Sequence, residues 1–448
     1  MILKRFNLSL NNKINNFKKT IIVDSDKSIS IRSFLIGAIS QNTSIIKNAL
    51  ESQDVLSTIS CLKKLGIKIN KFSPKNYSIN GKGLGSLFAK KNALLNFGNS
   101  GTLARLLIGI LSTTPGLEIK LTGDHSLKKR SMKKLILIMN KFGANFLPKN
   151  KFNFPIKLIS SKIPIAINYK AGVSAQLKSA VILAGLNSYG TTNIIEESKS
   201  RDHTEKMLLQ NNNLIKIKSQ KKKLLKITGR KYLNHLKINV PNDPSSAAFF
   251  VGLTLLMQNS SIKINKVCLN PTRIGFYKIL KKYGAKIKFE NIKKINNELI
   301  GNILAKSSNL KPIVASRKYY VNSTDEYPML FVIAALTKGV STFEGISDLA
   351  NKESNRITEM QKILNQIGVK TIASNNKLKI FGKKNIDYKS KKISVPSLGD
   401  HRICMSTFVL AILTGVKTKI NNFETVFTSS PSFLKIMKNL GAKFSIEK

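Results

Sequence analysis

The sequence LGIKI at residues 65–69 places a glycine directly after a helical pattern and continues with alternating apolar and polar residues. Glycine readily adopts the left-handed conformation that ends many helices, and a period of two is typical of a strand. The stretch therefore predicts a helix, a glycine cap and a strand. Related stretches follow along the chain: FGANF at 142–146, NLIKI at 213–217, which lacks the glycine, YGAKI at 283–287, IGVKT at 367–371 and LGAKF at 440–444.

A second pattern lies between these stretches and also occurs six times. It consists of an Ala- and Leu-rich helix, a Gly or Asn turn and an alternating strand. Each unit spans about 75 residues, which is longer than a solenoid repeat and indicates a small αβ subdomain. The helices are expected to begin near Ser28, Asn99, Ser174, Asp243, Asp325 and Asp400. The strands after them are expected to begin near Asn42, Gly116, Gly190, Asn259, Gly339 and Gly415.

The first helix of each unit is apolar around most of its circumference, as in VSAQLKSAVILAGL at 173–186 and DPSSAAFFVGLTLL at 243–256. Such helices are buried, whereas the second helix of each unit is amphipathic, rich in Lys and therefore outer. Three parallel buried helices in a domain would direct their positive N-termini toward one face. Each domain is therefore expected to carry a face suited to anions.

The composition of the chain limits its class. A chain of 448 residues with 42% hydrophobic residues exceeds one ordinary domain and predicts two. The formal charge of +52 would suit a nucleic-acid binder, but the Lys residues are spread along the chain, there is no Trp for base stacking, and the Phe residues are scattered. We interpret the charge as a solvated lysine surface whose field concentrates small anions.

The cysteines Cys61, Cys268 and Cys404 lie far apart and are odd in number, which favours neither a disulfide framework nor a metal site. A reducing, cytoplasmic location is expected. No apolar run has the length of a membrane span, and the N-terminus has no signal-peptide core, so we read it as mature protein.

Unusual polar residues gather where the buried helices are expected to begin. Any one of these openings could be a simple helix cap, but caps need no Arg, Gln or His, and five such openings at equivalent places in a repeat point to a site. The openings are SDKSISIR at 25–32, GNSGTLAR at 98–105, VSAQLKS at 173–179, TDEYP at 324–328 and GDHR at 399–402.

The outer helices also open with charged residues, and intrahelical pairing is the alternative explanation for them. Taken together, the two sets supply many cations and few carboxylates. That balance suits substrates that carry phosphate and carboxylate groups. The charged residues of the outer set are Asp54, Arg130, Arg201, Arg273, Lys352, Glu353 and Arg356.

These motifs resemble those of the 5-enolpyruvylshikimate-3-phosphate synthase family over nearly the whole chain and in the same order. The resemblance rests on DKSISIRSF, GNSGT, SAQLKSAVILAGLN, SRDHTEKML, DPSSAAF, NPTRIGF, DEYP, KES with Arg356, and DHR. It implies an α/β (α+β) fold of two domains, each built of three βαβαββ units around buried parallel helices. Residues 24–240 would form a domain that mainly binds shikimate phosphate. Residues 1–23 with 241–448 would form the domain that completes the phosphoenolpyruvate site.

The activity that the resemblance implies is transfer of the enolpyruvyl group of phosphoenolpyruvate to shikimate 3-phosphate in aromatic amino acid biosynthesis. It implies no cofactor, no metal and no nucleic-acid or membrane partner, and a monomer is expected. Asp325 would accept the hydroxyl proton, and Glu353 would deliver a proton to the methylene carbon, with Lys27 as an alternative acid. Lys352 and His401 would lie close to the reacting carbons.

The resemblance also assigns the binding residues. Shikimate 3-phosphate would be bound by Lys27, Ser28, Arg32, Ser174, Ala175, Gln176, Ser200, Arg201, Asp325 and Lys352. Phosphoenolpyruvate would be bound by Lys27, Gly101, Arg130, Gln176, Arg356 and Arg402. The chain departs from the family's usual residues at Asp24, Ser25, Ser131, Ala350, Asn351, Asn355 and Thr428.

Two alternatives remain beside this interpretation. The sister enzyme that transfers enolpyruvyl to a UDP-linked amino sugar shares the six-unit fold, but its loop cysteine has no counterpart before Arg130. A nonenzymatic nucleic-acid binder would exploit the +52 charge.

Overall fold

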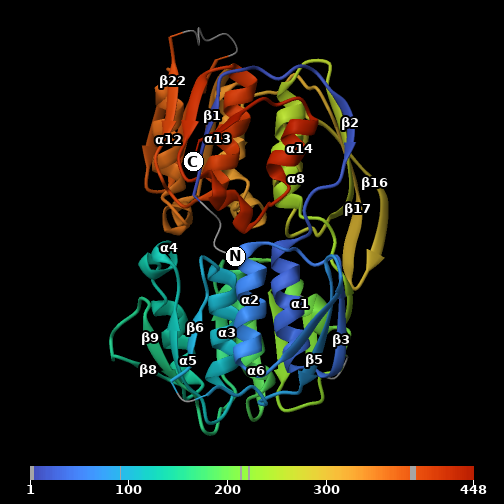
Figure 1. Ribbon diagram of the computed structural model, residues 1–448, viewed down its shortest axis with the longest axis vertical. Helices are drawn as coiled ribbons and strands as arrows, with labels where there is room; N and C mark the ends of the chain where they lie inside the picture. Colours follow the sequence, from blue (N-terminus) through green and yellow to red (C-terminus); the bar gives the residue numbers. More distant parts are fainter. Residues whose placement is uncertain (1–4, 91, 212–213, 220–221, 384–389, 448) are drawn as a thin grey trace. The chain divides into compact units, whose positions relative to one another are not determined.

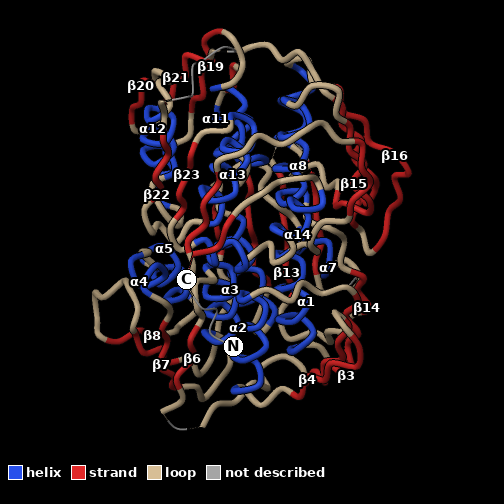
Figure 2. The backbone as a smooth tube through the Cα atoms, turned by 45° about the horizontal axis from the view of Figure 1, so that its top comes forward, coloured by secondary structure: helices blue, strands red, loops and turns tan. Residues whose placement is uncertain are grey.

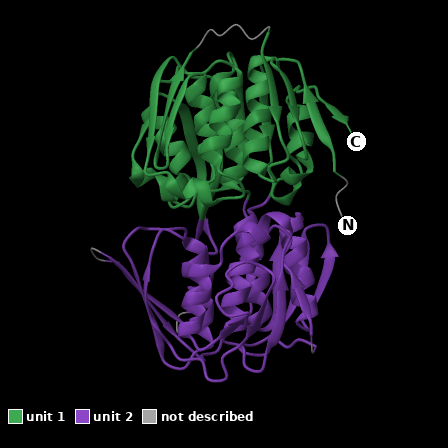
Figure 3. Cartoon of the chain, turned by 90° about the vertical axis from the view of Figure 1, so that its left-hand side faces the viewer, with its two compact units in different colours: residues 1–24, 242–293, 299–448 green, residues 25–241, 294–298 purple. Residues whose placement is uncertain are grey.

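The computed structural model describes residues 5–90, 92–211, 214–219, 222–383 and 390–447, which group into two compact units (Figures 1 and 3). Unit 1 consists of residues 1–24, 242–293 and 299–448, and unit 2 of residues 25–241 and 294–298. The domains proposed from the sequence have boundaries one residue away and differ further at residues 294–298. Their separate binding roles stay a prediction.

Strands β16 (Lys286–Ile295) and β17 (Glu298–Lys306) form a hairpin, and residues 294–298 lie at its tip. These residues group with unit 2 because their side chains bond to other residues of that unit. The Glu298 carboxylate lies 2.6 Å from His203 Nδ1 and 3.1 Å from Lys206 Nζ. The side-chain amide of Asn296 donates to the carbonyl oxygen of Lys237. The sequence pattern, which follows neighbours along the chain, does not reveal these contacts.

Unit 2 contains three four-stranded sheets with one pairing pattern. The first two strands of each sheet are parallel, and every later pair is antiparallel. The first sheet orders β14 (Lys237–Asn239), β3 (Gln41–Lys47), β5 (Asn76–Lys82) and β4 (Lys68–Ser73). The second orders β6 (Leu94–Asn96), β7 (Glu118–Thr122), β9 (Ile156–Ile159) and β8 (Asn145–Leu147). The third orders β10 (Asn168–Ala171), β11 (Thr191–Glu196), β13 (Lys223–Thr228) and β12 (Ile215–Ser219).

Unit 1 repeats this arrangement in three sheets, two of which contain a strand from the start of the chain. The first orders β2 (Lys18–Ile21), β15 (Ser261–Cys268), β17 and β16. The second orders β18 (Val314–Ala315), β19 (Gly339–Glu344), β21 (Lys377–Gly382) and β20 (Thr371–Ser374). The third orders β22 (Lys392–Val395), β23 (Lys417–Ile420), β1 (Asn7–Leu10) and β24 (Ser445–Glu447).

Each repeat contributes one long buried helix, and all six begin within a few residues of the predicted starts. In unit 2 these helices are α1 (Lys27–Ile39), α3 (Gly101–Ser112) and α6 (Ala175–Leu186). In unit 1 they are α8 (Pro244–Leu256), α11 (Tyr327–Ala335) and α13 (His401–Thr414). The six strands expected after them are β3, β7, β11, β15, β19 and β23. Together with the paired sheets, they confirm the predicted α/β fold of βαβαββ units.

The outer helices have 6 to 12 residues, and the strands flank the helices in both units (Figure 2). They are α2 (Gln53–Lys64), α5 (Lys133–Lys141), α7 (His203–Leu208), α9 (Gly275–Lys282), α12 (Arg356–Gln366) and α14 (Phe433–Asn439). Further short helices are α4 (His125–Lys129) and α10 (Tyr320–Ser323), with 3-10 turns η1 (Arg317–Tyr319), η2 (Ser347–Asn351) and η3 (Phe423–Thr428). Among the described residues, none of these or the buried helices is long and apolar enough to cross a membrane.

The predicted glycine caps are present. Gly66, Gly143, Gly284, Gly368 and Gly441 all have positive φ angles, between 79° and 102°. Glycine adopts this conformation without the steric cost that a side chain would add. In the copy without glycine, Asn213 lies outside the described residues, and β12 begins at Ile215.

The buried helices of unit 2 run parallel and begin at the same end. Near the start of α6, Gln176 bonds to Thr102 at the start of α3. A short distance farther along, Ser179 of α6 accepts a hydrogen bond from Arg32 of α1. Bonds between equivalent levels of three helices require a common direction, so the helix N-termini share one face of the unit. Their dipoles add positive potential to that face.

Candidate active site

Gln176 is held between two helices at this face of unit 2. Its Oε1 accepts a hydrogen bond from Arg105 Nη1 at 2.8 Å, and its Nε2 donates to Thr102 Oγ1 at 3.0 Å. Arg105 Nη1 also donates to the carbonyl oxygen of Gly101 at 3.1 Å. Thr102 and Arg105 belong to the polar opening GNSGTLAR that the sequence singles out, whereas the resemblance assigns a binding role to Gln176 and Gly101 but not to them.

Gly101 allows two guanidinium groups to approach the start of α3. A Cβ atom at this position would lie 2.7 Å from Arg105 Nη1 and 3.0 Å from Arg130 Nη1. Arg130 Nη2 also donates to Asn99 Oδ1 at 2.5 Å and to Ser126 Oγ at 3.2 Å. Two arginines beside a helix N-terminus are a strong arrangement for a phosphate or carboxylate group.

Arg32 is a buried cation whose guanidinium is bonded to neutral oxygens. Its Nε donates to Thr204 Oγ1 at 2.9 Å, Nη1 to the carbonyl oxygen of Ser28 at 2.9 Å, and Nη2 to Ser179 Oγ at 3.3 Å. Thr204 Oγ1 in turn donates to Ser179 Oγ at 2.8 Å. Hydroxyl and carbonyl partners satisfy the N–H groups without neutralising the charge.

The remaining predicted residues of unit 2 lie at helix starts. Ser174 caps α6, because its Oγ accepts from the N–H of Leu177, and Ala175 is the first residue of that helix. Lys27 begins α1 and forms an ion pair of 3.0 Å with Asp54 of α2. Ser200 and Arg201 precede Asp202, the cap residue of α7. Most predicted residues of unit 2 thus lie at helix N-termini, whereas Arg32 lies in the second turn of α1 and Arg130 directly follows the last residue of α4.

Arg356 is the centre of the predicted residues in unit 1. Its side chain is 1% exposed and contacts three carboxylates. Arg356 Nη2 lies 2.7 Å from Glu353 Oε2, and Nη1 lies 3.7 Å from Asp325 Oδ1. Burial lowers the pKa of the guanidinium, but Asp400, Glu353 and Asp325 outweigh it and raise the pKa overall. The two predicted proton-transfer residues, Asp325 and Glu353, therefore share one permanently charged partner.

Asp400 is the third partner of Arg356 and was not among the predicted site residues. Its carboxylate receives Arg356 Nε at 2.9 Å and Nη2 at 3.3 Å, which is a bidentate contact. It also caps α13 by accepting the N–H of Arg402 at 2.9 Å, and it accepts the Ser354 hydroxyl at 3.0 Å. The sequence placed Asp400 in the polar opening GDHR, but the resemblance assigned it no role.

Arg402 presents unused donors in the same unit. Its guanidinium lies 5.7 Å from the ring centroid of Phe249, within reach of a cation–π interaction. Nε and Nη1 are buried and have no hydrogen-bond partner among the described residues. Buried donors are normally bonded, so this pair is suited to receive an anionic ligand. His401, the first residue of α13, is buried beside it.

Lys352 pairs with a carboxylate other than the three that contact Arg356. Its Nζ lies 2.5 Å from Asp348 Oδ2, which also accepts the Tyr320 hydroxyl at 2.9 Å. Lys27, Gly101 and Arg130 belong to unit 2, whereas Arg356 and Arg402 belong to unit 1. That these residues form one phosphoenolpyruvate site stays a prediction.

Several departures from the family's usual residues have clear structural partners. Asn355 caps α12 by accepting the N–H of Thr358 at 3.2 Å, as an aspartate would. The buried Asp24 carboxylate accepts the hydroxyl of Ser430 at 3.0 Å and the hydroxyl of Ser432 at 2.7 Å. These two departures are therefore compatible with well-ordered local structure.

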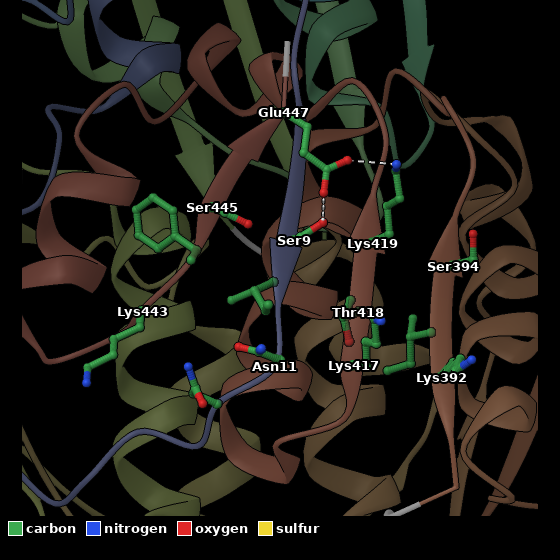
Figure 4. Close-up of a pocket in the computed structure, with 14 residues that line it drawn as sticks. Ser9, Asn11, Lys392, Ser394, Lys417, Thr418, Lys419, Lys443, Ser445 and Glu447 are labelled. Atoms are coloured by element: carbon green, nitrogen blue, oxygen red, sulfur yellow. Dashed lines mark hydrogen bonds and ion pairs between the residues drawn. The ribbon is translucent and has the colours of Figure 1, made fainter.

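Unit 1 also carries a hollow of ≈ 640 Å³ on the outer side of the sheet β22–β23–β1–β24 (Figure 4). Lys392, Lys417 and Lys443 line it, together with the ion pair of Lys419 and Glu447 at 2.7 Å. It contains none of the predicted site residues. We therefore place the candidate active site at the helix starts.

The cysteines of the chain are unsuited to acid catalysis. Cys61, Cys268 and Cys404 are buried and form no disulfide bond, and burial raises the pKa of the Cys61 thiol to about 12 despite nearby Lys64. Such thiols are poor proton donors. Among the described residues, no group of three or more His, Cys, Asp or Glu side chains could hold a metal ion.

Solved structures of other proteins share the fold of this chain. The chain is similar to the EPSP synthase from Acinetobacter baumannii, with a TM-score of 0.84, 32% identity and coverage of 99% of this chain and 100% of that one. It is also similar in fold to the enolpyruvyl transferase NikO from Streptomyces tendae, with a TM-score of 0.75, 12% identity and 99% coverage of both chains. The fold is therefore that of the enolpyruvyl transferases.

The sequence comparisons specify the family. The family model described as EPSP synthase (3-phosphoshikimate 1-carboxyvinyltransferase) matches residues 11–437. Relatives named 3-phosphoshikimate 1-carboxyvinyltransferase include one from Caldicellulosiruptor bescii, 39% identical over 96% of this chain and 98% of the relative. Another, from Zymomonas mobilis, is 36% identical over 95% of this chain and 94% of the relative. The chain belongs to the EPSP synthase family, which confirms the resemblance and the expected transferase class.

Proposed function

We propose that this chain transfers the enolpyruvyl group of phosphoenolpyruvate to a hydroxyl of shikimate 3-phosphate and releases phosphate. The reaction requires that the hydroxyl lose a proton, that the methylene carbon of phosphoenolpyruvate gain one, and that the tetrahedral adduct then expel phosphate. The observation that carries the proposal is Arg356, a buried guanidinium that holds two carboxylates suited to these proton transfers, Asp325 and Glu353.

In this proposal, shikimate 3-phosphate binds mainly to unit 2. Arg32 and the helix N-termini supply positive potential for the phosphate group, with Lys27, Ser28, Ser174 and Arg201 as further ligands. The partners of Arg32 support this role, because the oxygens of Thr204, Ser28 and Ser179 hold its guanidinium in place beside the helix starts. The proposed ligands of shikimate 3-phosphate also include Ala175, Gln176 and Ser200 of unit 2 and Asp325 and Lys352 of unit 1.

Phosphoenolpyruvate binds to arginines in this proposal. Arg130 lies at the start of α3 beside Gly101, and Arg402 presents buried N–H donors at the start of α13. Together with Arg356, Lys27 and Gln176, they would neutralise the carboxylate and phosphate charges that persist through the reaction.

Asp325 acts as the base and Glu353 as the acid. Both carboxylates contact the guanidinium of Arg356, which holds them in one cluster. Asp325 must accept the hydroxyl proton. Glu353 has to gain a proton before it can deliver one to the methylene carbon, and Lys27 is the alternative acid. Lys352 and His401 complete the proposed catalytic set.

We also propose that the chain works in the cytoplasm, as a monomer, on small anionic substrates. Three buried cysteines without a disulfide bond suit a reducing compartment. The +52 charge then serves to attract these anions and not a nucleic acid.

Phosphate release tests the proposal. Purified protein is mixed with shikimate 3-phosphate and phosphoenolpyruvate, and phosphate is measured with both substrates and with each one omitted. Release that requires both substrates is expected. Absence of release, together with a DNA mobility shift that weakens at high salt, would instead favour the nucleic-acid binder.

A further inference from the structure

A buried cluster of four charged side chains lies in the third repeat of unit 2. Lys178 of α6 is 0% exposed, and its Nζ lies 2.7 Å from Glu196 Oε1 and 2.7 Å from Glu205 Oε1. Lys223 lies 3.6 Å from Glu196 and 3.4 Å from Glu205. Two cations and two anions thus make the cluster neutral.

Lys178 and Glu196 each favour the charged form of the other. Burial lowers the pKa of Lys178, but Glu205 and Glu196 outweigh it and raise the pKa overall. Burial raises the pKa of Glu196, but Lys178 and Ser200 outweigh it and lower the pKa overall. Removing one partner from such a cluster would leave an uncompensated charge in a poorly solvated place.

The cluster connects directly to a residue of the proposed shikimate 3-phosphate site. Glu196 Oε1 accepts the N–H of Ser200 at 2.8 Å and the hydroxyl of Ser200 at 2.6 Å. Glu196 is the last residue of β11, so it ties the loop before α7 to the end of a strand. The position of Ser200 is therefore set by a carboxylate that Lys178 holds in place.

The cluster also borders the contacts that hold Arg32. Lys178 precedes Ser179 on α6, and Glu205 follows Thr204 on α7. Ser179 and Thr204 are the residues that accept hydrogen bonds from the Arg32 guanidinium. Fixing α6 and α7 through one buried lysine thus fixes both hydroxyls.

We infer that Lys178 and Glu196 are positioning residues for the phosphate group of shikimate 3-phosphate. Glu196 orients Ser200, and Lys178 cancels the negative charge that would otherwise lie beneath a dianionic ligand. This inference rests on the proposed function, specifically on the placement of the phosphate group at Ser200 and Arg32.

The Ser200 hydroxyl has one proton and can donate it to only one acceptor at a time. While it donates to Glu196 it cannot donate to a phosphate. On binding, the proton turns to the phosphate, and Glu196 keeps the N–H of Ser200 and the Lys178 ammonium. The backbone bond therefore holds the loop in both states.

Charge compensation provides the first test. Lys178→Met leaves the cluster one negative charge in excess, and the KM for shikimate 3-phosphate is expected to rise on the order of tenfold. Adding Glu196→Gln restores neutrality while keeping an oxygen acceptor for Ser200, so the double variant is expected to recover most of the loss. The KM for phosphoenolpyruvate should stay within about twofold in both. A double variant worse than Lys178→Met would overturn the charge argument.

The acceptor provides the second test, which does not depend on Lys178→Met folding. Glu196→Gln alone keeps an acceptor, and its KM for shikimate 3-phosphate should not rise. Glu196→Ala removes the acceptor, and its KM should rise on the order of tenfold. The activity with shikimate, which lacks the phosphate, should fall much less in Glu196→Ala. A positioning role would be contradicted if Glu196→Ala lost activity equally with shikimate and with shikimate 3-phosphate. It would also be contradicted if Glu196→Gln and Glu196→Ala had the same KM for shikimate 3-phosphate.

Two controls separate the possible failures. Lys222→Met removes the same charge from an exposed lysine paired with Glu197 and should change neither KM. Ser200→Ala tests the site assignment itself. If Ser200→Ala leaves the KM for shikimate 3-phosphate unchanged, the proposed site is wrong. If it raises that KM while the Lys178 and Glu196 variants do not, the site stands and the positioning inference fails.

Discussion

The two units hold their buried arginines in different ways. In unit 2, Arg32 is bonded to two hydroxyls and a carbonyl oxygen. In unit 1, Arg356 is bonded or paired to three carboxylates. Hydroxyl and carbonyl oxygens orient a guanidinium without neutralising its charge, whereas carboxylates neutralise much of it.

The helix caps show this contrast only in part. In unit 2, α3 and α6 are capped by Ser100 and Ser174, whereas α1 is capped by Asp26. In unit 1, α8 and α13 are capped by Asp243 and Asp400. The two serine caps add no negative charge to their helix starts. Aspartate caps add carboxylates that orient arginines, because Asp243 also pairs with Arg273 at 3.0 Å. In the proposed function, unit 2 accordingly serves mainly to bind anions and unit 1 to transfer protons.

The largest expected effect comes from removing the carboxylates on Arg356 that the proposed chemistry uses. Asp325→Ala and Glu353→Ala should each lower kcat by about 10² to 10⁴-fold, the usual contribution of a general base or acid. The KM values should change far less. Steady-state phosphate release at saturating substrates measures the effect.

A matched control is Glu359→Gln on α12, an acidic residue paired with the exposed Lys362. It should leave kcat unchanged. If Asp325→Ala and Glu353→Ala kept turnover within a few fold of the parent, the carboxylates of unit 1 would have a structural role and the comparison would fail.

Asp400→Asn tests whether the two roles of Asp400, capping α13 and binding Arg356, can be separated. Asparagine caps helices as well as aspartate, so α13 should be preserved. The bidentate charged contact to Arg356 is lost, and the KM for phosphoenolpyruvate should rise on the order of tenfold or more. The KM for shikimate 3-phosphate is the internal reference, and an equal rise in both would point to general disruption.

Local sequence predicted the elements well because their signals are local. Gly66 and its counterparts mark where a helix ends, and apolar runs such as DPSSAAFFVGLTLL mark which helices are buried. Six repetitions of the same signals then defined the fold. The helix starts followed from these signals, and with them the positions of Lys27, Gly101, Gln176 and Arg402, each at or near the start of its own helix.

Contacts between repeats could not be predicted in this way. Arg356 meets Asp400, 44 positions away, and Gln176 meets Arg105, 71 positions away. These pairs depend on how buried helices pack, which no local pattern encodes. Lys352 illustrates the reverse case, because its partner Asp348 lies one turn earlier and was overlooked in favour of the family's pattern.

Gly101→Ala probes the unit 2 face with a smaller change. The added methyl would meet Arg105 Nη1 at 2.7 Å and Arg130 Nη1 at 3.0 Å, so both guanidinium groups must shift. They are the far ends of flexible side chains, and folding should survive. The KM for phosphoenolpyruvate should rise on the order of tenfold, while that for shikimate 3-phosphate changes little. An unchanged KM for phosphoenolpyruvate would remove Arg130 from the proposed site.

Glu298 is a buried carboxylate of unit 2, and the comparison assigns it to stability and not to chemistry. Burial raises the pKa of Glu298, but His203 and Lys206 outweigh it and lower the pKa overall. A carboxyl whose pKa is lowered by folding stabilises the protein above its unfolded pKa of about 4.3. That contribution is lost as the pH falls from there through the lowered pKa of the folded state.

Glu298→Gln should therefore reduce the free energy of unfolding at pH 7 by about 1–2 kcal/mol. Below about pH 4.3, as the pH falls through the lowered pKa of the folded state, its stability should fall less steeply than that of the parent, because it has no carboxyl to protonate. Urea unfolding at several pH values measures both effects, and kcat at pH 7 should stay unchanged. Glu197→Gln removes an exposed glutamate paired with Lys170 and Lys222, and no loss of stability is expected. A large fall in kcat for Glu298→Gln would show that unit 2 also uses a carboxylate in catalysis, against the division of roles between the units.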